Sequence, residues 1–261
     1  MSNDRKPPTP ERSEEIRSLV KGLAVIKAFG PEHPRLTLTE VARATGLTRA
    51  AARRVLLTLK SLDYVAADER YFRLQPRVLE LGYTYLAGQP WWRVAQHVVE
   101  VMAEKIDNPV AAGVIDSDSA IYLAHARPRR FNAFVRSVGT RLPIGASAMG
   151  RVLLAHLPEA DREARLAGLP LVRLTKGTIT DRKRLRNTLE DIRRKGYALV
   201  DQELEMGLRS LAVPITDRGG HVAAAIGLST SDPVPDAKTL IMRHLQGLQD
   251  AAREIALSLP S

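Results

Sequence analysis

The chain has 261 residues, 44% of them hydrophobic, which is enough for one large packed domain or two ordinary ones. It has no cysteine, so a disulfide framework, a thiol nucleophile and a thiolate metal site are excluded, as is typical of a reducing compartment. The formal net charge of +10, from 39 basic and 29 acidic side chains, favours polyanionic partners. No apolar run reaches the roughly 20 residues that span a bilayer, so we expect a cytoplasmic protein without a membrane partner.

The first 14 residues are polar and rich in proline, so we expect a disordered tail over 1–14 rather than a signal peptide. A helix is then predicted from Glu14 to Phe29, because apolar residues recur at helical spacing. Gly30 and Pro31 end this helix. Its apolar stripe consists of Ile16, Leu19, Val20, Leu23, Ile26 and Ala28.

A capping box and a glycine turn mark two further helices. Thr37, followed three residues later by Glu40, starts a short helix that Gly46 closes. Thr48 is a good N-cap for a third helix, which we expect to extend to Leu62.

Two short strands follow, Tyr64–Ala66 and Tyr71–Leu74, joined by a turn over Ala67–Arg70. Three helices and a two-stranded wing within about 60 residues are the layout of a winged helix-turn-helix, which we predict over 15–75. In this layout the second helix and its turn hold the third helix away from the domain body, so that its N-terminal residues enter a major groove.

The third helix is basic. Arg49 and Arg53 are four residues apart on one face, and the small residues at 50 to 52, all alanine, allow close approach to DNA. Residues 16 to 75 hold 11 basic and 5 acidic side chains, so positive charge is concentrated in this segment. The alternative is an ordinary solvated face on a core helix. We predict DNA contacts from Thr37, Thr48, Arg49, Ala50, Ala51, Arg53, Arg54 and, in the wing, Arg70.

A linker helix and a mixed α+β region are predicted after the wing. The linker helix covers 76–89, starting at Pro76 and broken at Gly88. From residue 90 to 261 the pattern changes between helices and strands. Helices are expected at Trp91–Ile106, Ser147–Leu157, Asp181–Lys195 and Pro235–Leu257, and strands at Val110–Ile115, Ile121–Ala126, Phe131–Val135, Tyr197–Val200, Leu208–Ile215 and His221–Thr230.

We find no catalytic or metal-binding constellation in this second region. The nearest candidate, Gly145–Gly150, misses the G-x-S-x-G nucleophile elbow because Met149 stands where the second glycine belongs. The six histidines are scattered without ligand-like pairing, so surface or capping positions explain them. Asp201, Glu203 and Glu205 cluster in sequence, and a solvated loop explains them. We therefore predict no enzyme activity, no metal and no cofactor.

Four segments carry a resemblance to a known family. They are GLAVIKAFGPEHPRLTLTEVARATGLTRAAARRVLLTLKSLDYV with the wing and RVLELGYTYL, then LPIGASAMGRVLLA, KGYALVDQELEMGLRSLAVPI and AAAIGLST. They resemble the isocitrate lyase regulator (IclR) family of bacterial transcription factors, closest to the branch that regulates aromatic acid breakdown through the β-ketoadipate pathway. The resemblance implies an α+β protein with an N-terminal winged helix-turn-helix, a linker helix and, over 90–261, a GAF-like (profilin-like) α/β domain for effector binding and oligomerisation.

The resemblance also implies an effector site, built from a helix start, the loop before the G-L-R motif and two following strands. Carried over to matching positions, the site consists of Ala148, Met149, Val200, Asp201, Ser210, Gly227 and Ser229. A helix start offers backbone N–H groups to an anionic ligand. Core packing is the alternative for Met149 and Val200. Candidate carboxylate partners are Arg127, Arg136 and Arg209, the last with an equally good structural explanation.

We therefore expect a ligand-responsive DNA-binding transcription factor that controls aromatic acid catabolism. Its expected partners are double-stranded DNA with a pseudo-palindromic operator, a small carboxylate or aromatic acid effector, and further copies of the chain in a homodimer or dimer of dimers. One alternative is a DNA-binding protein of an unrelated regulon whose C-terminal domain only oligomerises. The other is a small-molecule enzyme with an accessory basic domain, whose turnover Ser147→Ala would abolish.

Overall fold

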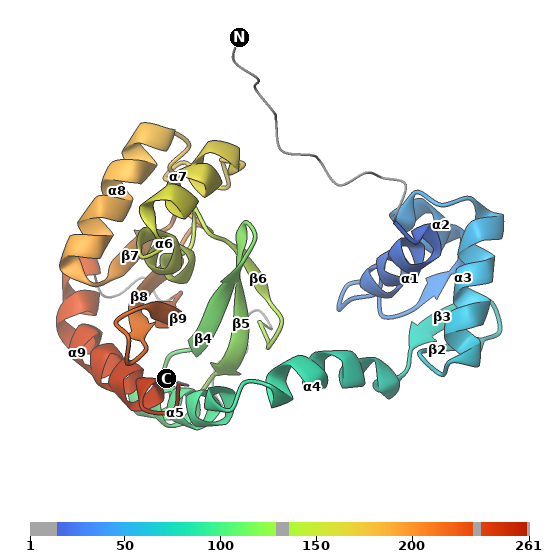
Figure 1. Ribbon diagram of the computed structural model, residues 1–261, viewed down its shortest axis with the longest axis horizontal. Helices are drawn as coiled ribbons and strands as arrows, with labels where there is room; N and C mark the ends of the chain where they lie inside the picture. Colours follow the sequence, from blue (N-terminus) through green and yellow to red (C-terminus); the bar gives the residue numbers. More distant parts are fainter. Residues whose placement is uncertain (1–14, 129–135, 232–235, 260–261) are drawn as a thin grey trace, which may run out of the picture. The chain divides into compact units, whose positions relative to one another are not determined.

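The computed structural model describes residues 15–128, 136–231 and 236–259. The chain divides into two compact units, with the boundary between Tyr85 and Leu86 (Figure 1). Each unit has a hydrophobic core of its own. The tail predicted over 1–14 and the strand predicted at Phe131–Val135 lie outside the described residues.

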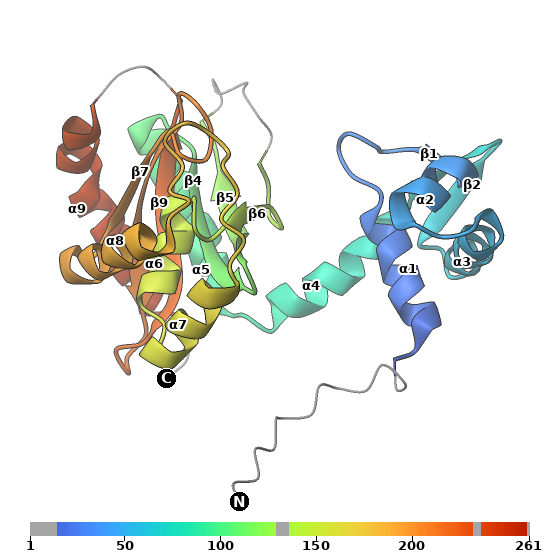
Figure 2. The same ribbon diagram turned by 90° about the horizontal axis from the view of Figure 1, so that it is seen from above.

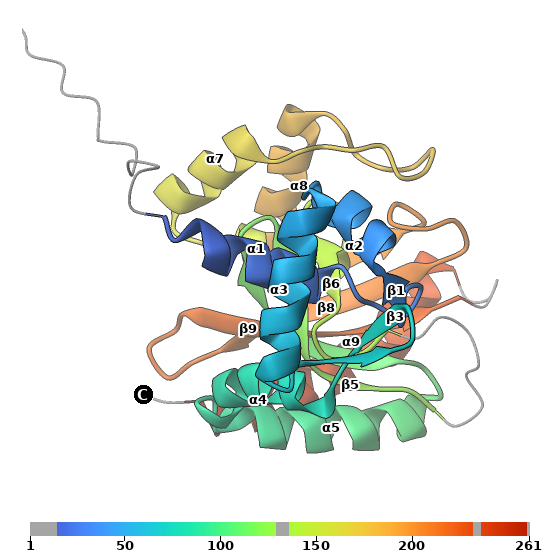
Figure 3. The same cartoon turned by 90° about the vertical axis from the view of Figure 1, so that its right-hand side faces the viewer.

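Within residues 15–85, the first unit combines helices with a small antiparallel sheet of order β1-β3-β2. Its elements are α1 (Arg17–Lys27), β1 (Leu36–Thr37), α2 (Leu38–Thr45), α3 (Arg49–Ser61), β2 (Val65–Asp68) and β3 (Tyr71–Leu74). Strand β1 was not predicted, because two residues carry no periodic signal. In Figure 3, α3 runs across the face of this unit that is turned to the viewer.

Local sequence signals set the ends of α2. The Thr37 hydroxyl accepts a hydrogen bond from the Glu40 backbone N–H at 3.3 Å, and the Glu40 carboxylate accepts one from the Thr37 N–H at 2.7 Å. This is the reciprocal capping box that the sequence predicts. Gly46 ends the helix with a φ of 66°, a left-handed conformation that glycine adopts without strain.

The wing turn is tighter than predicted. Asp68 pairs with Tyr71 across the hairpin, so Ala67 and Asp68 belong to β2 and only Glu69 and Arg70 form the turn. Glu69 has a φ of 50°, as two-residue hairpin turns require. The predicted four-residue turn was too long because the charged side chain of Asp68 is exposed and does not prevent this residue from pairing with the opposite strand.

The apolar stripe of α1 is largely exposed. A stripe of this kind usually faces the core, but only Val25 within the helix is buried, with Phe29 just beyond it. Most of the predicted stripe faces solvent, with exposed fractions between 44% and 67% for Ile16, Leu19, Val20 and Leu23. Its last two members, Ile26 and Ala28, are partly buried and pack against the core.

A helix is present where the linker helix is predicted. It opens with a single 3-10 turn at Pro76–Val78, since proline is tolerated in the first turn of a helix, and continues as α4 (Leu79–Ala87). Four of its large side chains are at least half exposed, namely Leu79, Leu81, Tyr83 and Tyr85.

In its described residues, the second unit is built on a six-stranded antiparallel sheet of order β6-β5-β4-β9-β8-β7 (Figure 1). Because β4 pairs with β9, strands from opposite ends of the unit lie side by side. Its elements are α5 (Trp91–Ile106), β4 (Val110–Asp116), β5 (Ser119–Ala126), β6 (Arg141–Pro143), α6 (Ala148–Ala155), α7 (Glu159–Gly168), α8 (Arg182–Lys195), β7 (Ala198–Asp201), β8 (Arg209–Thr216), β9 (Val222–Thr230) and α9 (Ala237–Ala256).

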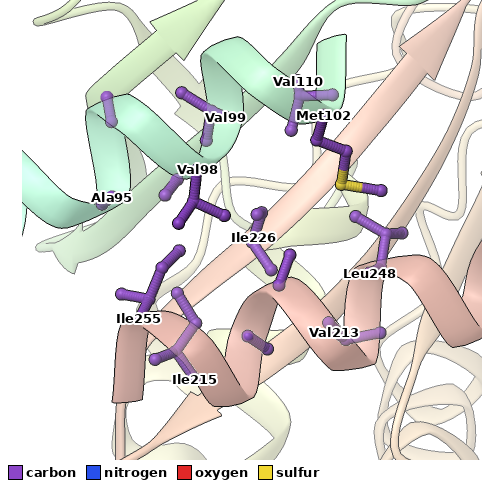
Figure 4. Packing of buried hydrophobic residues seen from close by; sticks show 14 of the residues in the cluster. Ala95, Val98, Val99, Met102, Val110, Val213, Ile215, Ile226, Leu248 and Ile255 are labelled. Atoms are coloured by element: carbon purple, nitrogen blue, oxygen red, sulfur yellow. The ribbon is translucent and has the colours of Figure 1, made fainter. Parts of the chain in front are cut away.

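Helices cover both faces of this sheet, with α5 and α9 on one and α6, α7 and α8 on the other (Figures 1 and 2). Alternate residues of β8 enter different cores, Leu211 and Val213 on the α5–α9 side and Ala212 on the α6 side. Figure 4 shows the first core, where Val98 of α5 and Leu248 of α9 lie on either side of Ile226.

Two elements of this unit were not predicted. Strand β6 pairs with β5 through Leu142 and Ala120, but three residues that include a proline give no alternating pattern. Helix α7 buries only Arg162 and Leu166, so its apolar stripe is too weak to recognise. The predicted α+β class, with a winged helix-turn-helix followed by a sheet-based domain, is confirmed.

Candidate nucleic-acid interface and small-molecule cavity

Helix α3 presents its basic side chains to solvent and its apolar side to the core. The Thr48 side chain caps the helix by accepting a hydrogen bond from the Ala51 N–H at 3.2 Å. The buried face consists of Ala52, Leu56 and Leu59. The exposed basic residues are Arg49, Arg53, Arg54 and, in the last turn, Lys60.

The alanines of α3 do not share one environment. Ala50 is exposed and Ala51 is half-buried. Ala52 is 0% exposed and packs in the core. Close approach to DNA is therefore open to the first two only, and the expectation for Ala52 was wrong because this position lies on the buried stripe of the helix.

Within the described part of the chain, the three arginines of α3 have no acidic partner. The nearby carboxylates of Asp68 and Asp63 pair with Arg35 at 3.6 Å and Arg77 at 3.5 Å. Among the residues that the structure describes, no carboxylate oxygen lies within 4.0 Å of an α3 guanidinium group. The first turn of α3 also lacks an acid, so Arg49 stands at the positive end of the helix dipole, which costs about 0.3–1 kcal/mol. Such an arrangement suits an external phosphate.

Thr37 and Arg70 differ in how they are held. The Thr37 hydroxyl donates to the Glu40 carboxylate at 2.8 Å, so it is engaged in the capping box. Arg70, in the turn of the wing, donates to the Tyr71 hydroxyl at 3.1 Å and lies 5.1 Å from the centre of that ring. The cation–π contact holds Arg70 against the exposed wing.

A cavity of about 120 Å³ lies in the second unit between the sheet and the start of α6. For comparison, an apolar cavity of about 150 Å³ holds one benzene ring. The walls are mainly apolar and include Val110, Tyr122, Leu142, Met149, Leu208 and Leu228. The polar groups include Ser147, Ser210, Ser229, His125, Arg127, Arg136 and Glu205. Apolar walls with a few polar groups are typical of a small-molecule site.

Five of the seven predicted effector residues line this cavity, namely Ala148, Met149, Ser210, Gly227 and Ser229. The sheet register brings them together, because Ser210 lies opposite Ser229, and Gly227 lies opposite Ala212. Close packing between β8 and β9 also explains why position 227 is a glycine. A Cβ atom at position 227 would lie 2.7 Å from the Leu211 carbonyl oxygen and 2.9 Å from the Ala212 Cβ.

Val200 and Asp201 do not line the cavity. Val200 is buried in the core on the α6 side of the sheet, which is the packing alternative that the sequence left open. The Asp201 carboxylate accepts a hydrogen bond from Arg209 Nε at 2.8 Å, so Arg209 has a structural role. Of the three candidate arginines, Arg127 and Arg136 are the two at the cavity.

Tyr122 and His125 of β5 line the cavity but were missed in the sequence. They lie three positions apart and would ordinarily face opposite sides of a strand. A bulge places them together, because Gly113 pairs with Tyr122 while Ala111 pairs with His125, leaving one extra residue on β5. Their rings stack at 5.8 Å with an interplanar angle of 12°, forming a flat aromatic wall.

The ionisation of these two side chains follows from burial and from the arginines. Burial raises the pKa of Tyr122, and Arg136 beside the hydroxyl offsets this in part. Burial, and then the positive charges of Arg127 and Arg136, hold the pKa of His125 below its ordinary value of 6.5. His125 is therefore neutral at neutral pH.

The sequence suggested that Glu203 lies in a solvated loop, but its side chain is largely buried. Arg151 of α6 is 1% exposed and donates to both Glu203 carboxylate oxygens, at 2.7 and 2.6 Å. Its Nε also donates to the Gly145 carbonyl at 2.9 Å, and the Ile179 N–H donates to Glu203 at 3.0 Å. The expectation was wrong because the partner is a buried arginine 52 positions away. This pair anchors the β7–β8 connection to the helix that forms one cavity wall.

The lowered pKa of His125 predicts an acid-sensitive second unit. Between the folded pKa and the unfolded value of about 6.5, the unfolded chain binds the proton more readily, so stability falls as pH decreases through this window. His125→Gln should therefore lose less stability between pH 7.5 and 5.5 than the wild type, measured by urea unfolding. The exposed His97→Gln serves as control, and equal losses in all three proteins would contradict the prediction.

Within the described ranges, no group of three or more His, Asp or Glu side chains is arranged to hold a metal ion. None of the helices described is both long and apolar enough to cross a membrane. The cavity combines a stacked aromatic wall, serine hydroxyls and guanidinium groups, which are suited to an aromatic ring that bears an anionic group.

Two family descriptions match the chain. Bacterial transcriptional regulator IclR C-terminal matches residues 83–257, and IclR helix-turn-helix domain matches residues 18–69. Among relatives, the Pca operon regulatory protein of Acinetobacter baylyi is 34% identical, over 92% of this chain and 88% of its own. The p-hydroxybenzoate hydroxylase transcriptional activator of the same organism is 35% identical, over 94% of this chain and 95% of its own.

One similar solved structure holds an aromatic acid. It is the IclR homolog of Microbacterium hydrocarbonoxydans in complex with 4-hydroxybenzoate, with a TM-score of 0.79 and 26% identity, covering 93% of this chain and 98% of that chain. The family and these relatives are transcriptional regulators rather than enzymes, as the sequence predicts. With its winged helix-turn-helix and the basic helix α3, the chain belongs to the IclR family of bacterial DNA-binding transcriptional regulators.

Proposed function

We propose that this regulator responds to an aromatic acid and controls genes of aromatic acid catabolism in the β-ketoadipate pathway. The observation that carries the proposal is the cavity, where a stacked Tyr122–His125 wall meets the guanidinium groups of Arg127 and Arg136. Apolar walls suit the ring, and guanidinium groups suit its carboxylate. The names of the two Acinetobacter relatives and the neighbour bound to 4-hydroxybenzoate support the same ligand class.

On the effector side, we propose that the ring lies against Met149 and the stacked pair, with its carboxylate toward Arg127 and Arg136. The hydroxyls of Ser210 and Ser229 would bind a polar ring substituent. The remaining proposed contacts are Ala148, whose small side chain leaves room for the ring, and the backbone of Gly227.

On the DNA side, we propose that α3 enters the major groove, where Arg49 and Arg53 reach base edges or phosphates from its first two turns. The charge of the α3 arginines and the exposure of the wing support this placement. The remaining proposed contacts are Thr37, Thr48, Ala50, Ala51, Arg54 and Arg70.

We also propose a homodimer or a dimer of dimers acting in the cytoplasm. Two reading helices that meet successive major grooves of a pseudo-palindromic operator must lie about 34 Å apart, which takes two copies of the chain. The exposed apolar stripe of α1 and the exposed side chains of α4 support self-association, since such patches mark interaction surfaces. Light scattering should give two or four times the mass of the chain, and a monomer at working concentration would contradict this.

The parts of the chain then have distinct roles. Residues 15–75 bind DNA, 76–89 form the linker helix, and 90–261 bind effector and oligomerise. An effector that binds one arrangement of the second unit more tightly shifts the population toward it. Through the linker helix this would alter the spacing of the reading helices and hence operator affinity.

Calorimetry on the full-length protein tests the ligand class. We expect 4-hydroxybenzoate or a related aromatic acid to bind with a dissociation constant in the micromolar range, about −8 kcal/mol, and its neutral amide to bind much more weakly. Ser210→Tyr, which fills the cavity, should abolish binding. If no aromatic acid binds, the ligand class is wrong. If one binds without changing affinity for an operator selected from random DNA, the second unit only oligomerises.

A further inference from the structure

The β7–β8 connection carries two glutamates in contrasting environments. Glu203 is 12% exposed and held by Arg151 through two short hydrogen bonds. The Glu205 side chain is 52% exposed and, among the described residues, makes one polar contact, at 3.3 Å, with a terminal nitrogen of Arg136. The connection is therefore fixed at one glutamate and only lightly held at the other.

Glu205 and Arg136 both line the cavity. Arg136 precedes β6 and Glu205 precedes β8, so their contact joins two connections that are 69 positions apart. Arg136 is 19% exposed, and its positive charge acts on the Tyr122 hydroxyl at the aromatic wall. Arg136 is thus a cation at the cavity with a protein carboxylate already beside it.

The single contact is a weak one for this pair of groups. Arginine and carboxylate bind best through two parallel hydrogen bonds of about 2.7–2.9 Å. Ion pairs exposed to solvent contribute little because water and salt screen them. A ligand carboxylate that binds Arg136 through two hydrogen bonds, with its ring against apolar walls, would therefore compete successfully.

We propose that Glu205 is an internal competitor, whose carboxylate must leave Arg136 before the carboxylate of an aromatic acid can bind there. This inference rests on the proposed function, because it concerns the same cavity and ligand class. Glu205 thereby limits the selectivity for an acid over its uncharged analogue, since only the acid must displace the Glu205 carboxylate from the guanidinium group. Glu203 keeps the connection in place while Glu205 moves.

The test is calorimetry on the full-length protein with 4-hydroxybenzoate and its uncharged analogue 4-hydroxybenzamide. In Glu205→Gln the dissociation constant of the acid should fall about three- to tenfold, because the competing charge is gone. The dissociation constant of the amide should stay within about twofold of wild type. In an Arg136→Gln background, Glu205→Gln should give no gain. Glu254→Gln, an exposed change of equal charge on α9, should alter neither constant.

Each other outcome has a distinct meaning. If the wild type binds the acid and Glu205→Gln binds it equally or more weakly, the competitor role is wrong while the proposed function stands. An equal gain for acid and amide would overturn it as well, because the substitution would then only have opened the cavity. The competitor role would also be wrong if Glu205→Gln still increased the affinity for the acid in the Arg136→Gln background. If neither wild type nor variant binds the acid, the proposed ligand class and the inference fail together.

Discussion

Replacing Glu203 with alanine is expected to lower the free energy of unfolding of the second unit by about 3–5 kcal/mol. The substitution leaves the guanidinium group of Arg151 charged, 1% exposed and without its carboxylate partner. It also removes the acceptor for the Ile179 N–H. A buried charge that loses its partner keeps its desolvation cost, which is why the loss greatly exceeds that of an exposed ion pair.

The structure offers a matched control in the same unit. Glu163 also binds an arginine through several hydrogen bonds, to Arg186 at 2.7 to 3.2 Å, but this pair is 36% and 44% exposed. Glu163→Ala should therefore destabilise the second unit far less than Glu203→Ala does. Urea unfolding followed by tryptophan fluorescence measures both changes, because Trp91 and Trp92 are the only tryptophans and lie in α5 of the second unit.

A double substitution separates charge from packing. Arg151→Met combined with Glu203→Leu removes both buried charges and retains apolar volume, so it should be less destabilising than Glu203→Ala alone. Equal stability of Glu203→Ala and Glu163→Ala would mean that Arg151 finds water or another acceptor after the change. That result would remove the assigned role of Glu203 as an anchor.

Loss of both leading arginines of α3 is expected to weaken operator binding by roughly 30-fold to 20,000-fold. Each contact to a base edge contributes about 1–3 kcal/mol, and Arg49 and Arg53 are exposed on adjacent turns of one face. The fold should remain intact because neither side chain is buried. Arg49→Ala should even stabilise α3 slightly, since it removes a cation from the positive end of the helix dipole.

Fluorescence anisotropy with an operator selected from random DNA measures this loss at physiological salt. Arg193→Ala combined with Arg194→Ala, which removes two exposed arginines from α8 in the second unit, controls for the change in net charge. The salt dependence identifies the kind of contact, because each lost phosphate contact lowers the slope of log affinity against log salt by about 0.9. Unchanged affinity in the double variant would show that α3 does not read the operator.

The sequence by itself determined the DNA-binding unit. The capping box at Thr37 and the left-handed Gly46 act through hydrogen bonds between residues three or four apart, so neighbours along the chain decide where α2 begins and ends. The helical period that buries Leu56 also exposes Arg53. The same helical period did not predict burial correctly for α1, most of whose apolar stripe is exposed, because a pattern indicates an apolar face without identifying the surface that covers it.

The cavity was only partly accessible to sequence reasoning. The resemblance located the positions that strand register brings together, such as Ser210 and Ser229. It did not locate the aromatic wall. Tyr122 and His125 share a face only because of a bulge in β5, and a bulge depends on pairing with β4 rather than on the residues of β5 alone.

The different environments of the two glutamates in the β7–β8 connection could not be predicted from the sequence. Glu203 and Glu205 are identical in chemistry and two residues apart, yet one is locked to a buried arginine 52 positions away and the other touches an arginine 69 positions away. Burial and charge pairing depend on neighbours in space, which folding brings from distant parts of the chain. Helix ends depend on neighbours in sequence, so the reading helix was predictable and the chemistry of the cavity was decided by the tertiary structure.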